Sequence, residues 1–397
     1  MNVMYIADVG ETGGATKSMM EMIYKLTKNY NVTPIVITSK KGKVSEFCDK
    51  NNFTTIASGH SAFYISSGQT ILKKIIKFIL IPFYFIDYKI RNVIAINRIV
   101  KSVEMDKIDI IHTNVNRNDV GAILAKKYKI PHVWHIREFG DLDYECFSLK
   151  SKYISFMNNN TTKFIAISKT IKQHWAKKGL LESKINVIYN GVNTKNSIEE
   201  VQKVHKNKND VKMIIAGNIS KNKGQIQVIE AINKLDKDVK SNIFLDIYGG
   251  GDNSYIAMLK RLVNKYNLSE NVKFKGSVNN LNNLLYNYDI GLMCSKSEAF
   301  GRVTVEYMAN GLITIASNTG ANQEIITNLN DGFIYQYNDY RNLAKIINKV
   351  YNLSEKEKEN IIKNAYDKVK NNFTSELNAY NIFNLYKKIL NKNNTDK

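Results

Sequence analysis

Short apolar runs recur along the first half of the chain, and longer stretches with helical periodicity separate them. We expect strands at residues 2–9, 32–38, 109–113, 132–136, 164–168 and 185–189. After the first of these strands, residues 11–18 form a polar turn that leads into a helix ending near Leu26. Short apolar strands that alternate with helices are typical of a parallel sheet with helices on both faces.

The alternation stops at a polar, charged stretch and then begins again. Residues 194–210 have the composition of a linker. Further strands are expected at residues 211–216, 243–248, 272–275, 289–295, 312–316 and 333–335. From Asn342 onward the pattern is helical. For burial, a final helix near residues 375–390 offers Leu377, Tyr380, Phe383, Leu385 and Tyr386.

The pattern therefore predicts an α/β protein with two Rossmann-like, doubly wound domains facing a central cleft. A chain of 397 residues is longer than one core usually supports. The predicted parts are an N-terminal domain over residues 1–193, a linker over 194–210, a second domain over 211–374, and a helix over 375–397 that packs back on the first domain. Ligands of such sheets bind at the carboxyl ends of the strands, so the cleft is the expected site.

Composition limits the compartment and the partners. The net charge is +21, but the lysines are scattered, no nucleic-acid motif appears, and we expect no nucleic-acid partner. The three cysteines are far apart, which favours reduced thiols in the cytoplasm over a structural zinc site. The chain opens on an expected strand and has no basic region followed by a cleavable apolar core, so no signal peptide is expected.

One apolar run, residues 78–86, is too short to span a bilayer. Basic residues flank it: Lys73, Lys74, Lys77, Lys89 and Arg91. Two interpretations stay open. Residues 71–91 form an interfacial helix on anionic lipid, or they form a long helix packed on its own domain.

Glu298 and Glu306 frame the segment that says most about chemistry. It lies between an expected strand and a helix over residues 303–309, and it contains Gly301. The amides at a helix N-terminus and a conformationally permissive glycine suit a bound phosphate. Two carboxylates beside a phosphate site favour recognition of sugar hydroxyls over hydrolysis.

Two other turns have the same strand-turn-helix character. Gly13 and Gly14 follow the first strand and allow close approach of a ligand, although a simple tight turn explains them as well. They complete neither a dinucleotide-binding pattern nor a P-loop. Lys223 follows the first strand of the second half, where it is placed to neutralise a diphosphate. Residues 249–251, three glycines, suit a nearby nucleotide or a plain loop equally.

His135 ends an expected strand and is a candidate for the cleft, with a packed, hydrogen-bonded histidine as the alternative. His112 presents the same two interpretations. No group of residues has metal-ligand spacing, and no nucleophile motif is present. We therefore predict no metal site.

The motifs together resemble one family. Residues 298–311, followed by 313–317 and 320–324, are similar to the C-terminal signature of family 4 glycosyltransferases, which are GT-B enzymes that retain anomeric configuration. Nearly the whole chain takes part in this resemblance. It also includes the Gly13-Gly14 loop and residues 165–168, 187–191, 216–217 and 223–224.

The resemblance implies a role for each matched residue. Glu298 would contact hydroxyls of the donor sugar, Glu306 the ribose hydroxyls, and Lys223 the diphosphate. Gly13 and Gly14 would approach the same phosphates, His135 would lie near the reacting sugar, and Glu324 would cap a helix near the donor. The remaining donor-binding residues would be Asn218, Ala299, Phe300, Gly301, Arg302 and Val303.

Asn218 departs from the family pattern, which usually has an arginine there. A neutral amide does not replace that charge, so either Lys221 or Arg302 compensates or diphosphate binding is weaker.

The resemblance implies a retaining glycosyltransferase with an acceptor-binding N-terminal domain and a nucleotide-sugar-binding second domain. The expected donor is a UDP-sugar, the acceptor a glycan or lipid-linked sugar of cell-surface polysaccharide or glycolipid synthesis, and no metal or other cofactor is needed. We expect a cytoplasmic protein in peripheral contact with anionic membrane. The alternative is a non-catalytic GT-B partner subunit of another glycosyltransferase, and a GT-B epimerase and a nucleic-acid binder are weaker hypotheses. The sequence does not specify the sugar, the linkage or the oligomeric state.

Overall fold

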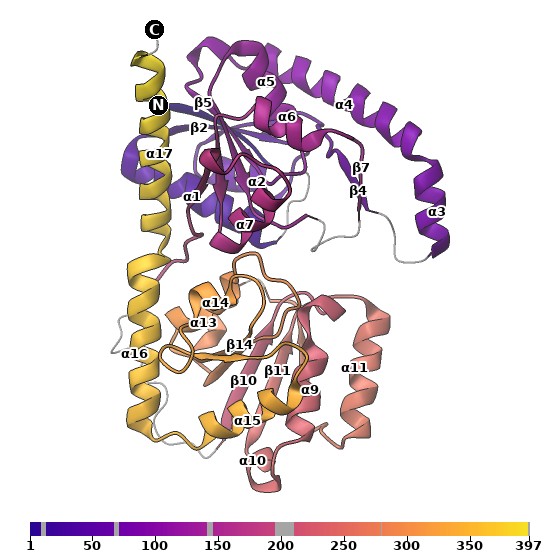
Figure 1. Cartoon of the computed structure of the whole chain (residues 1–397), viewed down its shortest axis with the longest axis vertical. Coiled ribbons are helices and arrows are strands. Elements are labelled where there is room, and N and C mark those ends of the chain that lie inside the picture. Colours follow the sequence, from indigo (N-terminus) through magenta and orange to yellow (C-terminus); the bar gives the residue numbers. More distant parts are fainter. Residues whose placement is uncertain (9–12, 67–70, 141–145, 195–209, 279, 396–397) are drawn as a thin grey trace. The chain divides into compact units, whose positions relative to one another are not determined.

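The computed structural model describes residues 1–8, 13–66, 71–140, 146–194, 210–278 and 280–395 (Figure 1). The chain divides into two compact units. The N-terminal unit contains Met1–Gly191 and Ser375–Lys397, and the C-terminal unit contains Val192–Thr374. Almost all of the expected linker lies outside the described residues.

The N-terminal unit contains a seven-stranded parallel sheet with the order β3-β2-β1-β5-β6-β8-β9. Its strands are β1 (Asn2–Ile6), β2 (Thr33–Thr38), β3 (Thr54–Ala57), β5 (Ile110–Asn114), β6 (His132–Ile136), β8 (Lys163–Ala166) and β9 (Ile185–Val187). The central strands β5 and β6 are buried along their whole length, as strands of a sheet covered on both faces must be.

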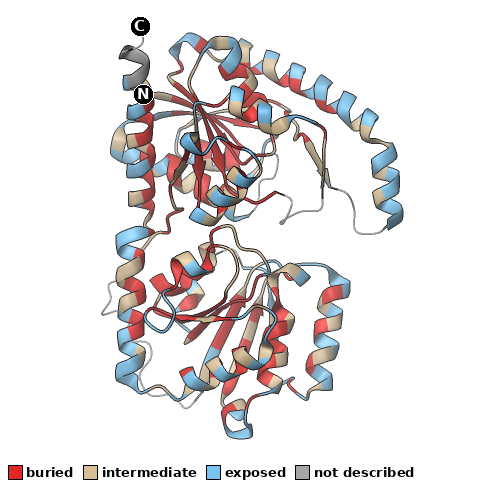
Figure 2. Cartoon of the chain, in the orientation of Figure 1, coloured by how far each residue is buried: buried red, intermediate tan, exposed pale blue. Residues whose placement is uncertain are grey.

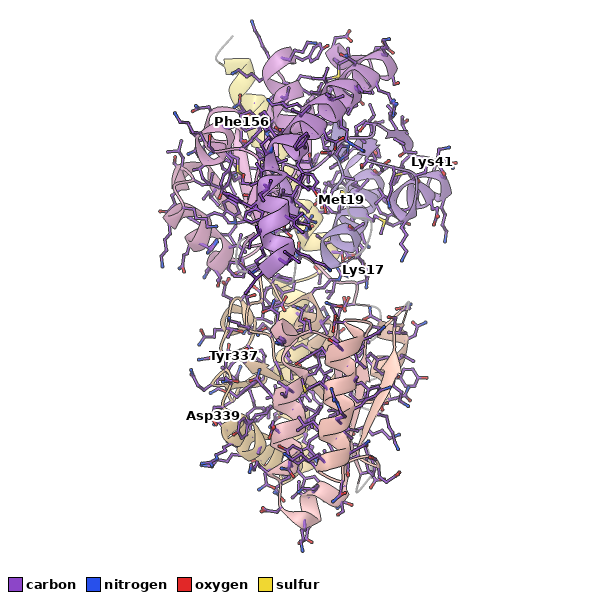
Figure 3. All side chains as sticks on the ribbon, turned by 90° about the vertical axis from the view of Figure 1, so that its right-hand side faces the viewer. Lys17, Met19, Lys41, Phe156, Tyr337 and Asp339 are labelled. Atoms are coloured by element: carbon purple, nitrogen blue, oxygen red, sulfur yellow. The ribbon has the colours of Figure 1, made fainter. Side chains whose placement is uncertain are left out.

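Helices cover this sheet, and the last helix of the chain is one of them. The helices are α1 (Gly14–Tyr30), α2 (Lys43–Lys50), α5 (Val120–Tyr128), α6 (Tyr153–Asn159), α7 (Lys169–Lys177) and α17 (Ser375–Thr395). α17 packs against α1, where Phe383 stacks on Tyr30 at 4.6 Å between ring centroids. Met19 of α1 is fully buried in the same core (Figure 3).

One residue expected in the buried face of α17 was placed wrongly. Tyr380 is 50% exposed. The buried stripe of the helix contains Ala379, Ile382, Tyr386 and Ile389, which recur every three or four residues. Tyr380 follows Ala379 by one residue, about a quarter of a turn away, and therefore falls off that stripe.

Several elements of the N-terminal unit were not expected from the sequence. β3 is a four-residue edge strand without a buried residue, and β4 (Tyr64–Ser66) pairs antiparallel with β7 (Cys146–Ser148). The helix expected over residues 71–91 is present as two consecutive helices, α3 (Ile71–Ile79) and α4 (Ile81–Ser102), which run along the side of the unit away from α17 (Figure 1).

The C-terminal unit contains a six-stranded parallel sheet with the order β12-β11-β10-β13-β14-β15. Its strands are β10 (Val211–Ala216), β11 (Ile243–Tyr248), β12 (Val272–Gly276), β13 (Ile290–Met293), β14 (Ile313–Ser317) and β15 (Phe333–Tyr335). Buried residues gather on the sheet and on the inner sides of its helices (Figure 2). The expected strands of both units are confirmed, with ends that differ by up to about three residues.

The helices of this unit alternate with its strands. They are the 3₁₀ turn η4 (Lys221–Lys223), α9 (Gln225–Asn233), α10 (Lys237–Ser241), α11 (Asn253–Lys265), α12 (Asn282–Leu285), α13 (Arg302–Ala309), α14 (Asn322–Ile325), α15 (Tyr340–Tyr351) and α16 (Glu355–Asn372). In both sheets the chain winds outward in two directions from one point, between β1 and β5 and between β10 and β13. Ligands of open α/β sheets bind outside the carboxyl ends of the strands at such a switch point.

Candidate active site

A lysine and a glutamate meet at the switch point of the C-terminal sheet. Lys223 Nζ donates to Glu298 Oε2 at 2.8 Å, and the Gly301 amide donates to Glu298 Oε1 at 3.2 Å. Lys223 ends η4, which follows β10, and Glu298 lies in the turn that follows β13. The Glu298 side chain is 14% exposed and that of Lys223 32%. The fold thus places a partly buried ion pair, with the lysine still reachable from solvent, where a ligand is expected.

Backbone contacts hold the two loops together. The Lys296 amide donates to the Asn222 carbonyl at 2.7 Å, and Gln227 Nε2 donates to the Cys294 carbonyl at 3.0 Å. Gln227 Oε1 in turn accepts from the hydroxyl of Tyr335 at 3.0 Å. Because buried polar groups are costly to leave unpaired, these contacts constrain the position of Lys223 relative to Glu298.

Two glycines shape the backbone around Glu298. Gly301 has φ +86° and precedes the first residue of α13, so it provides the left-handed turn that starts the helix. Gly320 has φ +55°, and a Cβ atom there would lie 2.0 Å from the Glu298 carbonyl oxygen. That oxygen accepts from the Ala321 amide at 2.9 Å. Only glycine therefore fits beside Glu298, and the amides at the start of α13 lie next to its carboxylate.

Glu306 is paired with Arg302 one turn away on α13. The Arg302 Nε atom donates to Glu306 Oε1 at 3.0 Å, and the two side chains are 10% and 4% exposed. The guanidinium of Arg302, one of the two cations that could compensate for Asn218, is thus engaged by Glu306. Asn218 is exposed, and its carbonyl accepts from Gln225 Nε2 at 3.1 Å.

The other expected donor-binding residues lie in the turn before α13 and at the start of that helix. Phe300 is buried and meets Phe373 edge to face, with ring centroids 5.9 Å apart. Ala299 lies in the same turn, and Val303 packs on the small core beneath β10. Glu324 lies on α14, and its amide donates to the Ala321 carbonyl at 2.9 Å.

The three glycines at 249–251 have a structural partner. The Ile219 amide donates to the Gly250 carbonyl at 2.8 Å, and a Cβ atom on Gly251 would lie 2.1 Å from the Ile219 carbonyl oxygen. These glycines let the loops after β10 and β11 pack directly on one another. The following Asp252 caps α11 by accepting from the Tyr255 amide at 2.9 Å.

His135 lies at the carboxyl end of β6 in the N-terminal unit and is fully buried. Its Nδ1 atom is 3.3 Å from Arg137 Nη2 and 3.1 Å from His112 Nε2. On its other side, His112 Nδ1 is 2.5 Å from the hydroxyl of Tyr386 on α17. His112 is thus a packed, hydrogen-bonded histidine, which was one of the two interpretations of it.

The donors in this chain assign the protons. A guanidinium only donates, so His135 Nδ1 accepts and its proton is on Nε2. His112 Nε2 then donates to His135, and His112 Nδ1 accepts from Tyr386. Burial and the nearby Arg137 charge hold the pKa of both histidines well below the usual value, so both are neutral.

This proton assignment makes His135 Nε2 a hydrogen-bond donor. Its Nε2 atom is buried and has no hydrogen-bond partner among the described residues. Because that nitrogen carries the proton, His135 is a hydrogen-bond donor toward a ligand and not a proton acceptor.

Sequence reasoning did not single out the residues that orient His135. Arg137 is buried, donating from Nε to Asn114 Oδ1 at 2.5 Å and from Nη1 to Asn190 Oδ1 at 2.6 Å. The signal was present, because Arg137 follows the expected strand by one residue. Its partners come from distant parts of the chain, and no local pattern shows them.

A second missed feature is the loop after β5. Val115 is buried with φ +69°, a strained conformation for a β-branched residue. Both polar side-chain atoms of the neighbouring Asn116 are buried and have no partner among the described residues. The signal that could have found it is a mostly polar stretch, residues 114–119, directly after an apolar strand.

The first glycines lie where the sequence predicted. Gly13 precedes α1 with φ +105°, and Gly14 is the first residue of the helix. Gly13, Gly14 and His135 belong to the N-terminal unit, and the other candidate residues belong to the C-terminal unit. Within the described ranges, no three His, Cys, Asp or Glu side chains are grouped as metal ligands.

Two family profiles match consecutive parts of the chain. The profile described as Glycosyltransferase Family 4 matches residues 12–196, and Glycosyl transferases group 1 matches residues 196–368. CapJ of Staphylococcus aureus is 29% identical over 213 residues, which are 49% of this chain and 50% of CapJ. The chain thus matches about half the length of that relative.

Two further likenesses extend over more of the chain. The UDP-Gal:alpha-D-GlcNAc-diphosphoundecaprenol alpha-1,3-galactosyltransferase of Escherichia coli is 24% identical over 314 residues, 75% of this chain and 80% of that enzyme. The crystal structure of HepE from Anabaena in complex with UDP has a TM-score of 0.77 at 19% identity, covering 98% of this chain and all of HepE. The expected GT-B fold, with two Rossmann-like domains, is confirmed.

Proposed function

Because this chain belongs to the group 1 glycosyltransferases of family 4, we propose that it moves a sugar, with retention of anomeric configuration, from a UDP-sugar to a glycan or lipid-linked acceptor. The reaction serves the synthesis of cell-surface polysaccharide or glycolipid. The observation that carries the proposal is the Lys223–Glu298 pair at the β10–β13 switch point. HepE, similar in fold, binds UDP, and the similar Escherichia coli enzyme uses UDP-Gal and a diphosphoundecaprenol-linked sugar.

The C-terminal unit binds the donor. Lys223 and the amides at the start of α13 stabilise the charge that develops on the leaving diphosphate. Glu298 accepts hydrogen bonds from hydroxyls of the transferred sugar, and Glu306 binds the ribose hydroxyls. These residues supply charge stabilisation in a fixed geometry, and in this proposal the reaction needs no metal ion.

The N-terminal unit binds the acceptor and presents His135. The proton on His135 Nε2 is donated in a hydrogen bond to a hydroxyl of the reacting sugar. His135 therefore positions the sugar and does not remove the proton of the acceptor hydroxyl. The leaving phosphate takes that proton as the acceptor attacks from the face that the phosphate leaves.

The enzyme works in the cytoplasm, in peripheral contact with the inner face of an anionic membrane. None of the described helices has the length and apolar character that a bilayer crossing requires. A lipid-linked acceptor would give such an enzyme a reason to stay near lipid.

A ligand screen tests the donor. We expect UDP-sugars to raise the melting temperature of the protein, because a ligand that binds only the folded state stabilises it in proportion to its affinity. Sugars linked to other nucleoside diphosphates form the comparison set. No stabilisation by any nucleotide sugar would contradict the proposed donor class.

Turnover of the UDP-sugar tests whether the chain is an active enzyme. We expect slow hydrolysis of the UDP-sugar without acceptor, lowered about a hundredfold or more in Glu298→Gln. The control is Glu270→Gln, which removes an exposed carboxylate of the same unit, 3.3 Å from Lys273, and should leave turnover unchanged. Equal background turnover in the wild type and in Glu298→Gln would mean that the chain is a non-catalytic partner subunit.

A further inference from the structure

Exposed apolar side chains concentrate in one short part of the N-terminal unit. In the part of the chain that the structure describes, 18 large hydrophobic residues are exposed, and 12 of them lie between positions 71 and 94. Monomeric proteins rarely expose contiguous apolar patches of this kind unless they bind something. Both helices that carry them lie on the side of the unit away from α17 (Figure 1, Figure 2).

α3 has its apolar side outward. Six apolar residues cover one side of this helix with exposed fractions from 47% to 79%, namely Ile71, Leu72, Ile75, Ile76, Phe78 and Ile79. The three lysines Lys73, Lys74 and Lys77 lie on the opposite side, and the last two are only partly exposed. Phe78 also meets Phe147 of β7 at 5.9 Å between ring centroids, which gives α3 a contact with the body of the unit. This polarity is the reverse of that of a helix packed on its own domain.

α4 continues the same surface. Its inner stripe, buried against the unit, is Tyr88, Asn92, Ala95 and Ile99. A second apolar stripe lies on the opposite side of the helix and is 51% to 70% exposed; it contains Phe83, Ile86, Ile90, Val93 and Ile94. We call these five residues and the six apolar residues of α3 the outer face.

The inner stripe prevents α4 from turning this outer face inward. The buried carboxylate of Asp119 accepts from the Tyr88 hydroxyl and, at 3.2 Å, from Asn92 Nδ2, and it forms an ion pair with Lys150. Asn92 Oδ1 also accepts from the Ser61 amide at 2.8 Å. Rolling the helix would leave these buried polar groups unpaired, which costs about 1–3 kcal/mol for each uncharged group and more for the carboxylate. The outer face therefore needs a partner outside the unit.

Charge indicates which partner. Between positions 71 and 102 there are seven basic residues, namely Lys73, Lys74, Lys77, Lys89, Arg91, Arg98 and Lys101, and one acidic residue, Asp87, a net charge of +6. Asp87 is paired with Arg91 at 2.8 Å. Two copies joined through this region would bring like charges together, whereas an anionic lipid surface complements them.

We propose that the outer face of α3 and α4 docks on an anionic lipid bilayer, with both helices lying in the interface and their apolar side chains at the level of the upper acyl chains. The long basic side chains extend from the polar sides of the helices back toward the headgroups. Of the two interpretations of residues 71–91, the structure thus favours the interfacial helix for α3, while α4 packs on its own unit and also presents an outer stripe.

The docking proposal deepens the proposed function, because it names the surface at which a lipid-linked acceptor would be met. Its test measures lipid binding and does not depend on turnover. Full-length protein is sedimented with vesicles that contain phosphatidylglycerol and with vesicles of phosphatidylcholine alone. We expect binding to the anionic vesicles that weakens as the salt concentration rises.

Two variants, called the outer-face variants, probe the two contributions. One changes the lysines of α3 that accompany the outer face, and the other changes apolar residues of the outer face itself. The triple change Lys73→Glu, Lys74→Glu and Lys77→Glu should weaken binding by about tenfold or more, since each lysine near an anionic surface contributes up to roughly fivefold. The triple change Phe83→Ser, Ile86→Ser and Ile90→Ser should weaken it by about a hundredfold, because the inserted apolar area is lost. These three residues are at least 55% exposed, so folding should be unaffected, and thermal melting checks this.

Matched controls separate the outer face from general charge and hydrophobicity. The control for charge is Lys40→Glu, Lys41→Glu and Lys50→Glu, which changes three exposed lysines of the same unit near α2 (Lys41 in Figure 3). The control for apolar surface is Leu181→Ser with Tyr286→Ser, two exposed residues elsewhere. Both should bind vesicles like the wild type.

Three results would overturn the proposal. They are equal binding to neutral and anionic vesicles, wild-type binding in both outer-face variants, and a wild-type dimer that the serine variant makes monomeric, since then a second copy covers the outer face. Donor hydrolysis in solution should be unchanged in the outer-face variants. Vesicle binding by a protein that hydrolyses no nucleotide sugar would defeat the proposed function and leave docking standing.

Discussion

The carboxyl edges of the two sheets share a topology and differ in chemistry. In the C-terminal unit the edge contains opposite charges in pairs, Lys223 with Glu298 and Arg302 with Glu306. In the N-terminal unit the corresponding edge also contains paired charges, Arg117 with Asp8 and Glu138. What distinguishes this edge is His135, which burial and Arg137 keep neutral and whose Nε2 proton is buried. The two parallel sheets thus have the same winding, but the loops at their carboxyl edges contain different functional side chains.

The difference matches the two kinds of substrate group that the proposed reaction brings together. A diphosphate is charged and is best bound by a cation and helix amides. Sugar hydroxyls are neutral and are best bound by uncharged donors and acceptors that are already oriented. The histidines follow the same division: the five in the described residues are all in the N-terminal unit, and His205 lies outside those residues.

The largest effect is expected from breaking the charge pair. Lys223→Met removes one of the cations of the C-terminal edge and the partner that the Glu298 carboxylate has at 2.8 Å. We expect kcat/KM for the donor to fall about a thousandfold, because the leaving diphosphate loses its counter-charge. The fall in kcat/KM is measured by steady-state kinetics with the UDP-sugar that the melting screen identifies.

The control for this variant is Lys273→Met. Lys273 forms an exposed pair with Glu270 in the same unit, and exposed pairs contribute little. Its kinetics should stay within about twofold of the wild type. A similar loss in both variants would mean that charge in general, and not the Lys223 position, supports activity.

Lowering the pH should destabilise the N-terminal unit more than the C-terminal unit. Burial lowers the pKa of His60, His112, His132 and His135, to about 3 for His132. A lowered pKa in the folded state means that the unfolded chain binds more protons below about pH 6.5, so the free energy of unfolding falls as the pH falls. Three strongly shifted histidines should lower it by about 3–4 kcal/mol between pH 6 and 5.

Both tryptophans, Trp134 and Trp175, are buried in the N-terminal unit, so their fluorescence in urea titrations at each pH follows that unit alone. Hydrogen exchange of β10 and β13 follows the C-terminal unit, which should lose less stability over the same range. Equal acid sensitivity of the two units would contradict the assignment of neutral, buried histidines to one of them.

A smaller effect should come from Tyr386→Phe on α17. The variant removes the hydroxyl that donates to His112 Nδ1, and so weakens one of the two contacts, beside that of Arg137, that keep the proton of His135 on Nε2. We expect kcat to fall about fivefold with KM for the donor unchanged, since one hydrogen bond is worth about 1 kcal/mol. Nitrogen NMR of the imidazole rings should show a mixture of His135 tautomers in place of one.

Tyr380→Phe is the control on the same helix, because Tyr380 is half exposed. It should change neither kcat nor the ring signals. If Tyr386→Phe lowered stability but left the His135 tautomer and kcat unaltered, Tyr386 would be a packing residue and not a positioning residue.

The sequence predicted the strands of both sheets because their apolar runs are local and strong. It placed Lys223 and Glu298 in turns at the right edge, but their 2.8 Å contact joins residues 75 positions apart, which no local pattern shows. For the same reason, the sequence did not predict the contact of Arg137 with Asn190 or that of Tyr386 with His112. β3 was missed because a short, half-exposed edge strand has little apolar content.

Residues 71–91 show a different limit. Their helical periodicity was visible, yet the choice between packing inward and facing outward depends on what the rest of the unit offers. Asp119, which is distant in sequence and paired with Lys150, decides it by binding Tyr88 and Asn92 of the inner stripe of α4. The predicted burial of Tyr380 was wrong for a similar reason. A tyrosine in an amphipathic helix was assigned to the core without regard to its angular position on that helix.

A crystal structure of the full chain with its UDP-sugar tests the central claim most directly. The account predicts that the diphosphate lies within hydrogen-bond distance of Lys223 Nζ and of the amides that begin α13, with Glu298 on the sugar. A donor bound elsewhere, with the Lys223–Glu298 contact intact and that edge of the sheet empty, would contradict it.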